Sequence, residues 1–465
     1  MVSFSELRPS YVNFVEFVSL GYRREFVNIY LGFLVIFAAL FYIFKSRENI
    51  HVKFIALYFS LSFFTNFAYQ MYGARLFDYV GIVISLIAIL IILKRKLKIL
   101  FFEKTLFLLA AILFLHLLIL YGAGYFGKYD AADRVFFQRM VMVLRVFILF
   151  FVVLYFTNFV KTEKDIDFIV STFKYVGMAI LFIMMVQEIL FFGFGNSTVG
   201  LNVASGGVLL PRFASVAIEG GHFGRLLPTF LIYFLAQKGD KLKVGLLFCF
   251  LIGLSATNIS ASFYGCLFFL ILSLAVTHLS FCKIRNSKTF LIVCGLVGFL
   301  ICYYFYDYVY LLGEKVVGLV FGFGDAYSGF FNRRWGFVYK SLSQFPLGIG
   351  FGVSNRFLPD GSYTDSGIFA VISQLSALSF VFILFFLYYW HFQLRTFVKN
   401  KRELVNKRYA PHAIIMLLAT PLIFFFDIVW LYPGYILPFL VLSTYINNLK
   451  ERPETTKSHL MQATS

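Results

Sequence analysis

Long apolar runs recur along almost the whole chain, from Val27 to Asn447, and they limit the folds that it can adopt. A helix needs roughly 20 apolar residues to cross about 30 Å of hydrocarbon, and many of these runs approach that length. Sixty percent of the residues are hydrophobic and only 14% are charged, with a mean hydropathy of +0.83. This composition excludes a soluble domain, and we predict an all-α polytopic integral membrane protein.

The runs predict about 13 transmembrane helices, within a range of roughly 12 to 14. No repeat and no soluble stretch divides the chain, so we interpret residues 1–465 as a single membrane domain. The polar tail at 451–465 is expected to be a disordered cytoplasmic segment. The predicted spans are 27–44, 54–72, 77–93, 105–121, 140–160, 168–192, 223–237, 244–256, 261–279, 289–306, 369–390, 413–431 and 435–447.

The net charge of +18 is distributed in a way that does not indicate nucleic acid. The basic clusters lie between apolar runs, in alternate loops, and the positive-inside rule places such loops in the cytoplasm. The same basic residues would also attract anionic membrane lipid. We predict no nucleic-acid partner. Two long segments, approximately 193–222 and 307–368, are then predicted to lie outside. The clusters are Lys45/Arg47/Lys53, Lys94/Arg95/Lys96/Lys98, Lys238/Lys241/Lys243, Lys283/Arg285/Lys288 and Arg395 to Arg408.

The first outer segment ends in PRFASVAIEGGHFGRLLP, which brings Arg212, Glu219, His222 and Arg225 to the start of a predicted span. Small residues between them leave the backbone open to a bulky ligand. Arg212 and Glu219 share a side if the segment is helical, so a structural ion pair is one interpretation. The other is a site for a multiply charged anion, since guanidinium groups bind phosphate oxygens bidentately.

The second outer segment contains SGFFNRRWGFVYKSLSQFPLGIGFGVSNRFLPDGSYTDSGIFA at residues 328–370. Arg333 and Arg334 lie in the first turn of a predicted amphipathic helix, which ends at Pro346. The following GIGFG lacks the lysine of a phosphate loop, and we expect a sharp reversal of the chain there. The predicted apolar face consists of Phe331, Trp335, Val338, Leu342 and Phe345.

Asp365, in YTDSGIF before the next span, is a candidate general base. A carboxylate accepts the proton of an attacking hydroxyl when its pKa is raised toward neutrality. The alternative is an N-cap of the following helix, a role that Ser366 could take instead. Tyr363 lies beside this motif as a candidate substrate-binding residue.

Polar residues within the predicted spans include Arg145, Lys174, His116 and Asp427. Arg145 and Lys174 are costly in hydrocarbon and must face a polar cavity or a counter-ion. His116 and Asp427 are expected to be hydrogen-bonded within the helix bundle. The five cysteines show no CxxC or Cys/His spacing, so neither a disulfide framework nor a metal site is predicted.

Three motifs together resemble the O-antigen polymerase and ligase superfamily, with its Wzy-type polymerases. They are RFASVAIEGGHFG, NRRWGFVYKSLSQFPLGIGFG and SYTDSGIF, and their order and spacing carry the resemblance. Many spans with two major periplasmic loops match the plan of that family over nearly the whole chain. Ligases usually carry a histidine followed by asparagine where this chain has Asp365-Ser366, which favours a polymerase.

The resemblance implies a cofactor-free, metal-independent glycosyltransferase of the GT-C type in a bacterial inner membrane, with its active site facing the periplasm. Its partners would be undecaprenyl-diphosphate-linked glycans, as donor and acceptor, and a chain-length regulator protein. Arg212 and Arg333 or Arg334 would bind the leaving diphosphate, and Asp365 or Glu219 would be the base. The alternatives are a ligase that transfers glycan to lipid A core and a flippase or transporter of lipid-linked oligosaccharide, although no internal repeat indicates a transporter.

Overall fold

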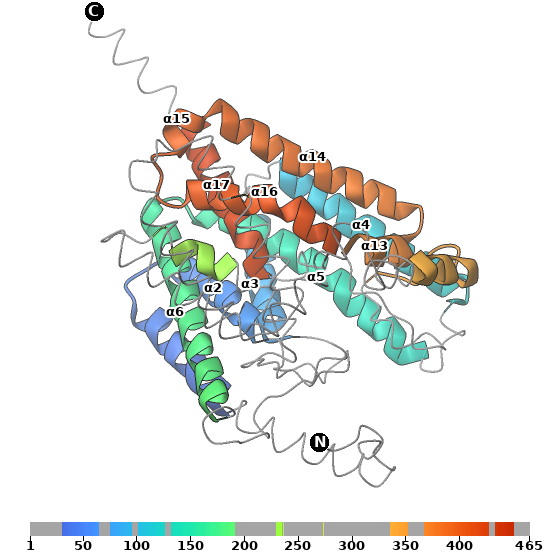
Figure 1. Ribbon diagram of the computed structural model, residues 1–465, viewed down its shortest axis with the longest axis horizontal. Helices are drawn as coiled ribbons and strands as arrows, with labels where there is room; N and C mark the ends of the chain where they lie inside the picture. Colours follow the sequence, from blue (N-terminus) through green and yellow to red (C-terminus); the bar gives the residue numbers. More distant parts are fainter. Residues whose placement is uncertain are drawn as a thin grey trace, which may run out of the picture.

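The structure of this chain is a computed structural model, and the part that it describes is mostly helical, with no strand (Figure 1). The described residues are 30–64, 75–94, 101–125, 132–190, 229–234, 236, 273, 335–351, 367–426 and 433–450. The helices are Tyr30–Lys45, α2 (Ile50–Ser60), η1 (Leu61–Phe63), α3 (Leu76–Lys94), α4 (Phe101–Gly122), α5 (Ala132–Phe159), α6 (Glu163–Glu188), α13 (Gly367–Leu375), α14 (Leu378–Lys399), α15 (Lys401–Leu404), α16 (Ala410–Phe426), α17 (Pro433–Lys450) and unlabelled helical turns at 229–234 and 335–344.

Five of these helices contain a stretch long and apolar enough to cross a membrane. The stretches are Leu76–Lys94, Glu103–Gly122, Arg139–Phe159, Glu163–Gln187 and Leu378–Lys399, with 19 to 25 residues each. At 1.5 Å per residue, the shortest is close to 30 Å long. The prediction of an all-α membrane protein is confirmed at this level. The total of about 13 spans, the two large outer loops, the GT-C likeness and the single domain stay predictions.

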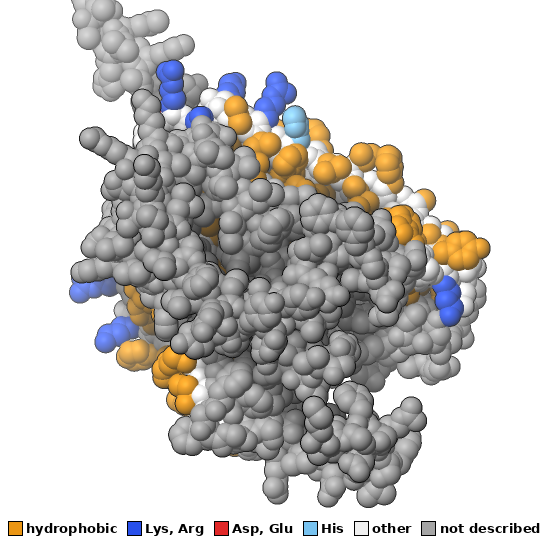
Figure 2. All heavy atoms as spheres, in the orientation of Figure 1, with side chains coloured by type: hydrophobic (Ala, Val, Ile, Leu, Met, Phe, Trp, Pro, Cys, Tyr) orange, Lys and Arg blue, Asp and Glu red, His pale blue; other side chains and the backbone are white. Residues whose placement is uncertain are grey.

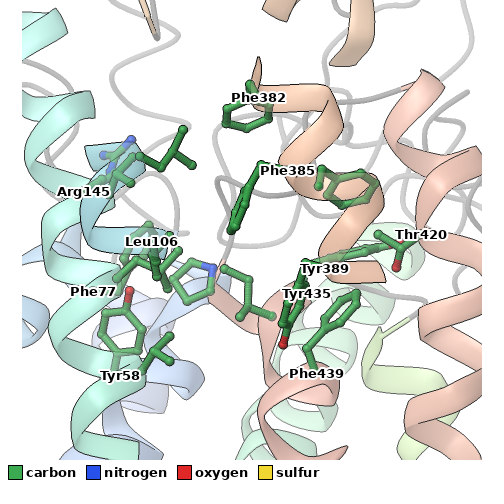
Figure 3. A pocket seen from close by; sticks show the side chains of 17 residues that line it. Tyr58, Phe77, Leu106, Arg145, Phe382, Phe385, Tyr389, Thr420, Tyr435 and Phe439 are labelled. Atoms are coloured by element: carbon green, nitrogen blue, oxygen red, sulfur yellow. The ribbon is translucent and has the colours of Figure 1, made fainter. Parts of the chain in front are cut away.

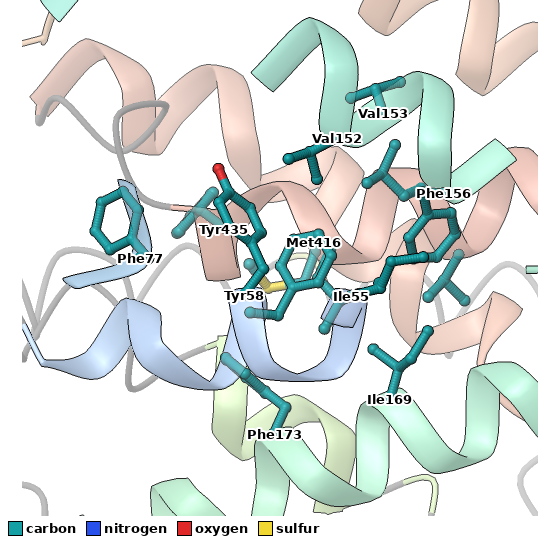
Figure 4. Close-up of a cluster of buried hydrophobic side chains, with 14 of the residues drawn as sticks. Ile55, Tyr58, Phe77, Val152, Val153, Phe156, Ile169, Phe173, Met416 and Tyr435 are labelled. Carbon is teal, nitrogen blue, oxygen red and sulfur yellow. The ribbon is translucent and has the colours of Figure 1, made fainter. Parts of the chain in front are cut away.

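The core is formed by aromatic and branched side chains between the N-terminal and C-terminal helices. α5 packs along α3 and α4, α2 packs along α6, and α16 packs along α17 (Figure 1). Rings from different helices meet edge to face, as Phe59 and Phe156 do at 6.1 Å between centroids, or stack, as Phe63 and Phe173 do at 4.8 Å. Figure 4 shows part of this core, with Phe156 and Phe173 among the labelled side chains. The abundant phenylalanines therefore serve both as core and, on the outer faces, as lipid-exposed surface.

The basic loops meet at one end of the bundle. Lys164 lies 2.8 Å from Glu48, and the Asn448 side chain donates a hydrogen bond to the Lys161 carbonyl at 2.8 Å. Arg408 pairs with Asp167 on α6. We call this end, where residues 45–53, 161–167 and 399–408 meet, the basic end. Figure 2 shows Lys and Arg side chains gathered there beyond a row of hydrophobic side chains along α14.

Helix caps explain why the chain turns at this end. Thr162 accepts a hydrogen bond from the backbone N–H of Asp165, whose carboxylate accepts one from the Thr162 N–H in return. This capping box satisfies two otherwise unpaired donors at the start of α6. Asn49 caps α2 by accepting from the His51 N–H at 3.0 Å.

The predicted span at 369–390 is wrong in one respect, because the helix is interrupted. α13 ends at Leu375, and α14 begins at Leu378 and continues to Lys399. Ser376 between them has a φ of 50°, in the left-handed region that does not continue a right-handed helix. Its hydroxyl donates to the Pro346 carbonyl at 2.6 Å, so a contact from a distant segment stabilises the break.

The amphipathic helix predicted before Pro346 is present at 335–344, but its buried face is rotated from the predicted one. Val338 and Phe345 are buried as predicted, whereas Trp335 is 53% exposed. Phe337 and Ser341 complete the buried face in its place. A face that follows 337, 338, 341 and 345 fits the 3.6-residue period equally well, and tertiary packing decides between the two. Phe331 lies outside the described residues.

Candidate functional site

The predicted site residues themselves lie outside the described residues. These are Arg212, Glu219, His222, Arg225, Arg333, Arg334, Tyr363 and Asp365, and Asp427 is also among the residues not described. The structure does describe part of two of the three motifs, namely the residues that follow the paired arginines and those that follow Asp365. The helix at 335–344 begins one residue after Arg334, and α13 begins two residues after Asp365.

These two segments are in contact. The rings of Trp335 and Phe369 meet edge to face, with 5.0 Å between their centroids and 86° between their planes. Trp335 follows the paired arginines of one motif, and Phe369 belongs to the SYTDSGIF motif. The fold thus brings together one residue from each of two motifs, Trp335 and Phe369, across about 30 intervening residues of the chain.

A glycine turn fixes the relative position of the same two segments. It comprises residues 345–351, and Gly348 and Gly350 have φ values of 90° and 95° that only glycine adopts freely. The backbone N–H groups of Ile349 and Gly350 donate to the carbonyls of Ser373 and Gln374, each at 3.0 Å. The last carbonyls of α13, which have no partner inside the helix, are satisfied in this way. The turn is therefore present over the described residues, and it caps α13, while the predicted reversal of the chain beyond Phe351 stays a prediction.

Arg139 lies beneath this turn. Its residue is fully buried, and a Cβ atom added at Gly350 would be only 2.6 Å from its Nε. His116 on α4 reaches the turn from a second side, where its Nε2 lies 2.8 Å from the Leu347 carbonyl oxygen. His116 is thus hydrogen-bonded within the bundle, as predicted. We call this end of the bundle, opposite the basic end, the turn end.

The sequence alone does not single out Arg139 as a site residue. It stands at the edge of a predicted span, where a snorkelling arginine is ordinary. Its position along α5 could have indicated that it is buried. Arg139 is seven residues, or about two helical turns, before Val146, and Val146 is seven residues before Val153. All three therefore lie on the same face of α5, and both valines are buried in the core. A buried face of α5 predicts a buried arginine at that position.

A buried ion pair lies about 9 Å further along α5, six residues after Arg139. Arg145 donates from Nε to Asp78 Oδ1 at 2.8 Å and from Nη2 to Oδ2 at 2.6 Å, and both side chains are less than one tenth exposed. Asp78 also accepts from the Arg75 backbone N–H at 2.7 Å. The predicted need of Arg145 for a counter-ion is met by a carboxylate 67 residues earlier in the chain.

Lys174, the second basic residue predicted to need a polar partner, lies on α6 away from this pair. Its residue is 6% exposed, and its Nζ stands 5.8 Å from the centroid of the Phe234 ring. A cation over an aromatic face is a favourable arrangement in a desolvated environment. The polar partner predicted for Lys174 is thus replaced by an aromatic contact with Phe234. This contact is separate from the residues at the turn end.

An apolar pocket of about 140 Å³ opens between α2, α3, α4, α5, α14, α16 and α17. Figure 3 shows Tyr58, Phe77 and Arg145 on one side of it, facing Tyr389 and Tyr435 on the other. Arg145 is the one charged residue among the side chains that line it. The pocket therefore offers hydrocarbon contacts over most of its wall, with a guanidinium and several phenol groups as polar points.

No group of three or more His, Cys, Asp or Glu side chains within the described ranges is arranged to hold a metal ion. The independence from metal that the resemblance implies stays a prediction. Comparison of the chain with protein-family models, curated proteins and solved structures finds no match. The functional conclusion therefore depends on the motifs and on the contacts at the turn end.

Proposed function

We propose that this protein is a glycosyltransferase that polymerises undecaprenyl-diphosphate-linked oligosaccharide repeat units into O-antigen or a related surface polysaccharide. The observation that carries the proposal is the contact between Trp335 and Phe369, reinforced by the glycine turn. Consecutive Cα atoms are 3.8 Å apart, so Arg334 is one step and Asp365 four steps along the chain from this contact. This supports a shared site for a phosphate-binding arginine and a carboxylate.

The proposed reaction is a single displacement at the anomeric carbon of the donor glycan. The bond from that carbon to the diphosphate oxygen breaks, and the electron pair stays on the diphosphate. The acceptor hydroxyl oxygen forms the new bond, and its proton passes to Asp365 or Glu219. Arg212, Arg333 and Arg334 stabilise the departing charge, so no general acid is required, while His222, Arg225 and Tyr363 contact the substrate.

The apolar pocket is consistent with a substrate that carries a hydrocarbon chain. Its wall is formed largely by Phe, Leu, Val and Ile side chains, and Arg145 on α5 is six residues from Arg139 at the turn end. In this proposal the hydrocarbon chain of the carrier lipid occupies the pocket within the helix bundle. The diphosphate and the sugars occupy the turn end. The positive-inside rule assigns the turn end to the periplasm of a bacterial inner membrane.

The experiment that tests this function is the lipopolysaccharide ladder of a strain without the gene, complemented with the wild type or single variants. We expect a core with one repeat unit in the deletion strain, and the same from Arg333→Ala, Arg334→Ala and Asp365→Asn at normal expression. A core without any repeat, with polymer retained on the carrier lipid, would indicate a ligase. A full-length ladder in the deletion strain would overturn the proposal.

A further inference from the structure

The helix at 335–344 exposes a face on which aromatic and polar side chains alternate. Its inner side is packed by Phe337, Val338, Ser341 and Phe345, all of which are buried. The remaining positions form one continuous arc of the helix, since successive residues are 100° apart. The exposed side chains on that arc are Trp335, Tyr339, Lys340, Ser343 and Gln344.

Trp335 and Tyr339 are one helical turn apart and so lie side by side on this arc. Trp335 is 53% exposed and Tyr339 is 78% exposed. We call this pair the aromatic strip. The Trp335 ring is held by its edge-to-face contact with Phe369, and the helix beneath both rings is fixed by its buried face. The Trp335 ring is therefore oriented before any ligand binds, and the buried face of the helix fixes the backbone position of Tyr339 beside it.

Lipid-exposed faces of the same protein differ from this arc. The outer face of α14 exposes Phe380, Val381, Leu384 and Leu387, and that of α3 exposes Leu86 and Leu90. Those faces are apolar along several turns, as contact with acyl chains requires. The aromatic strip is instead interleaved with a lysine, a serine and a glutamine, which would have to be desolvated against hydrocarbon. Its chemistry fits a ligand that has both apolar and hydroxyl-rich surfaces.

We propose that the aromatic strip is a glycan-binding subsite, in which pyranose rings stack on Trp335 and Tyr339. A pyranose presents C–H groups on one face and hydroxyl groups around its rim, so it complements an aromatic ring bordered by polar side chains. Trp335 directly follows Arg333 and Arg334 in the chain, which are proposed to bind the diphosphate. Sugars further along the glycan than the one that reacts would therefore reach the subsite. The inference rests on the proposed function and adds the residues that hold the glycan.

Tryptophan fluorescence provides a direct test, because the chain has three tryptophans, at 335, 390 and 430. A Trp390→Phe/Trp430→Phe variant leaves Trp335 as the reporter in the full-length protein. The probe is the water-soluble oligosaccharide released by mild acid from the lipid-linked repeat unit of the host strain. We expect a saturable change in Trp335 emission, and a Tyr339→Ala change in this background should weaken binding by about 3- to 10-fold.

Brominated lipid in the same proteoliposomes distinguishes a glycan subsite from an aromatic anchor in the membrane interface. Strong quenching of Trp335 by brominated lipid, without a response to the oligosaccharide, would assign the strip to the bilayer and overturn the inference. An absence of any saturable response to the oligosaccharide would overturn it as well.

Polymer length gives a readout in cells. Trp335→Ala and Tyr339→Ala are expected to shorten the polysaccharide, while Trp335→Tyr restores most of it and Phe392→Ala, an exposed aromatic change on α14, leaves it normal. Normal polymer length in both alanine variants would contradict the subsite. The two proposals can fail separately. A full ladder in the deletion strain would contradict the polymerase function. A deletion strain with a single repeat unit, together with polymer of normal length from Trp335→Ala and Tyr339→Ala, would contradict only the glycan subsite.

Discussion

At the scale of single residues, Asp78 and Arg145 show how charge is accommodated in this bundle. The pair is bidentate, and each side chain is less than one tenth exposed. Two desolvated charges contribute little net stability when they are paired, but either one alone is strongly unfavourable. The same guanidinium lies over the Phe77 ring, at 5.6 Å, and forms part of the pocket wall.

We therefore predict that Asp78→Ala destabilises the protein by about 3–5 kcal/mol, because Arg145 is left as an unpaired buried charge. Thermal unfolding of the purified protein in detergent measures this change. The double variant Asp78→Leu/Arg145→Met should recover most of the loss. Lys164→Ala, which removes a 76% exposed side chain from its pair with Glu48, is the control and should have little effect. Equal losses in Asp78→Ala and Lys164→Ala would contradict this account.

Gly350 is required by both its conformation and its surroundings. Its φ of 95° disfavours any residue with a Cβ atom, and that atom would be 2.6 Å from Arg139 Nε. Gly350→Ala should cost roughly 1–3 kcal/mol in the same unfolding measurement. The matched control is Gly336→Ala, in a helix where an added Cβ meets nothing within 4 Å, and it should be neutral or stabilising. Similar stabilities for the two variants would show that the turn is not constrained.

His51 makes the stability of the basic end depend on pH. It lies in the first turn of α2, against the Tyr155 hydroxyl and the Phe159 ring, and burial lowers its pKa. A lowered pKa in the folded state means that the neutral ring stabilises the protein at high pH. This contribution is lost as the pH falls below about 6.5, the ordinary value for histidine. We expect His51→Gln to have a flatter profile of unfolding temperature between about pH 5 and 8 than the wild type.

At the scale of elements, the glycine turn and the break between α13 and α14 depend on each other. The turn caps α13 with two backbone hydrogen bonds, and the Ser376 hydroxyl in the break binds the Pro346 carbonyl. Irregular backbone within a membrane bundle persists where such polar contacts satisfy it. The two elements together fix the helix at 335–344 beside α13, which is the arrangement that the proposed site needs.

The same elements show what the sequence could and could not predict. Spans such as Leu76–Lys94 and Glu103–Gly122 follow from the length and hydropathy of a single run, and the predicted boundaries agree within two residues. The break at Ser376 depends on a contact 30 residues away. The Asp78–Arg145 pair likewise joins distant positions, so local pattern does not reveal it. The need of Arg145 for a partner was predictable, but the identity of the partner was not.

At the scale of the whole molecule, the two ends differ in a way that topology experiments can examine. The basic end collects Lys161, Lys164, Lys407 and Arg408, and the turn end carries the exposed Tyr339. The positive-inside rule predicts a cytoplasmic basic end, so we expect the two ends to respond differently to reagents that do not cross the membrane.

In a background with the five native cysteines replaced, Tyr339→Cys should react with a membrane-impermeant maleimide applied to spheroplasts. Lys164→Cys, which is also exposed, should react only after the membrane is permeabilised. Both positions are exposed in the folded protein, so a difference in their reaction with the maleimide would report which side of the membrane each one faces. The opposite pattern would invert the orientation and exclude a periplasmic turn end.

The measurement that tests the central claim most directly is polymerisation by the purified protein in liposomes supplied with undecaprenyl-diphosphate-linked repeat units. We predict that polymer forms with release of one undecaprenyl diphosphate for each new linkage, and that a chelator of divalent metals does not slow it. Arg333→Ala or Arg334→Ala should lower the rate by about 100-fold or more, as expected when a group that stabilises the leaving charge is removed. Absence of polymer with folded wild-type protein, or full activity in every variant of Arg333, Arg334, Glu219 and Asp365, would contradict the proposed mechanism.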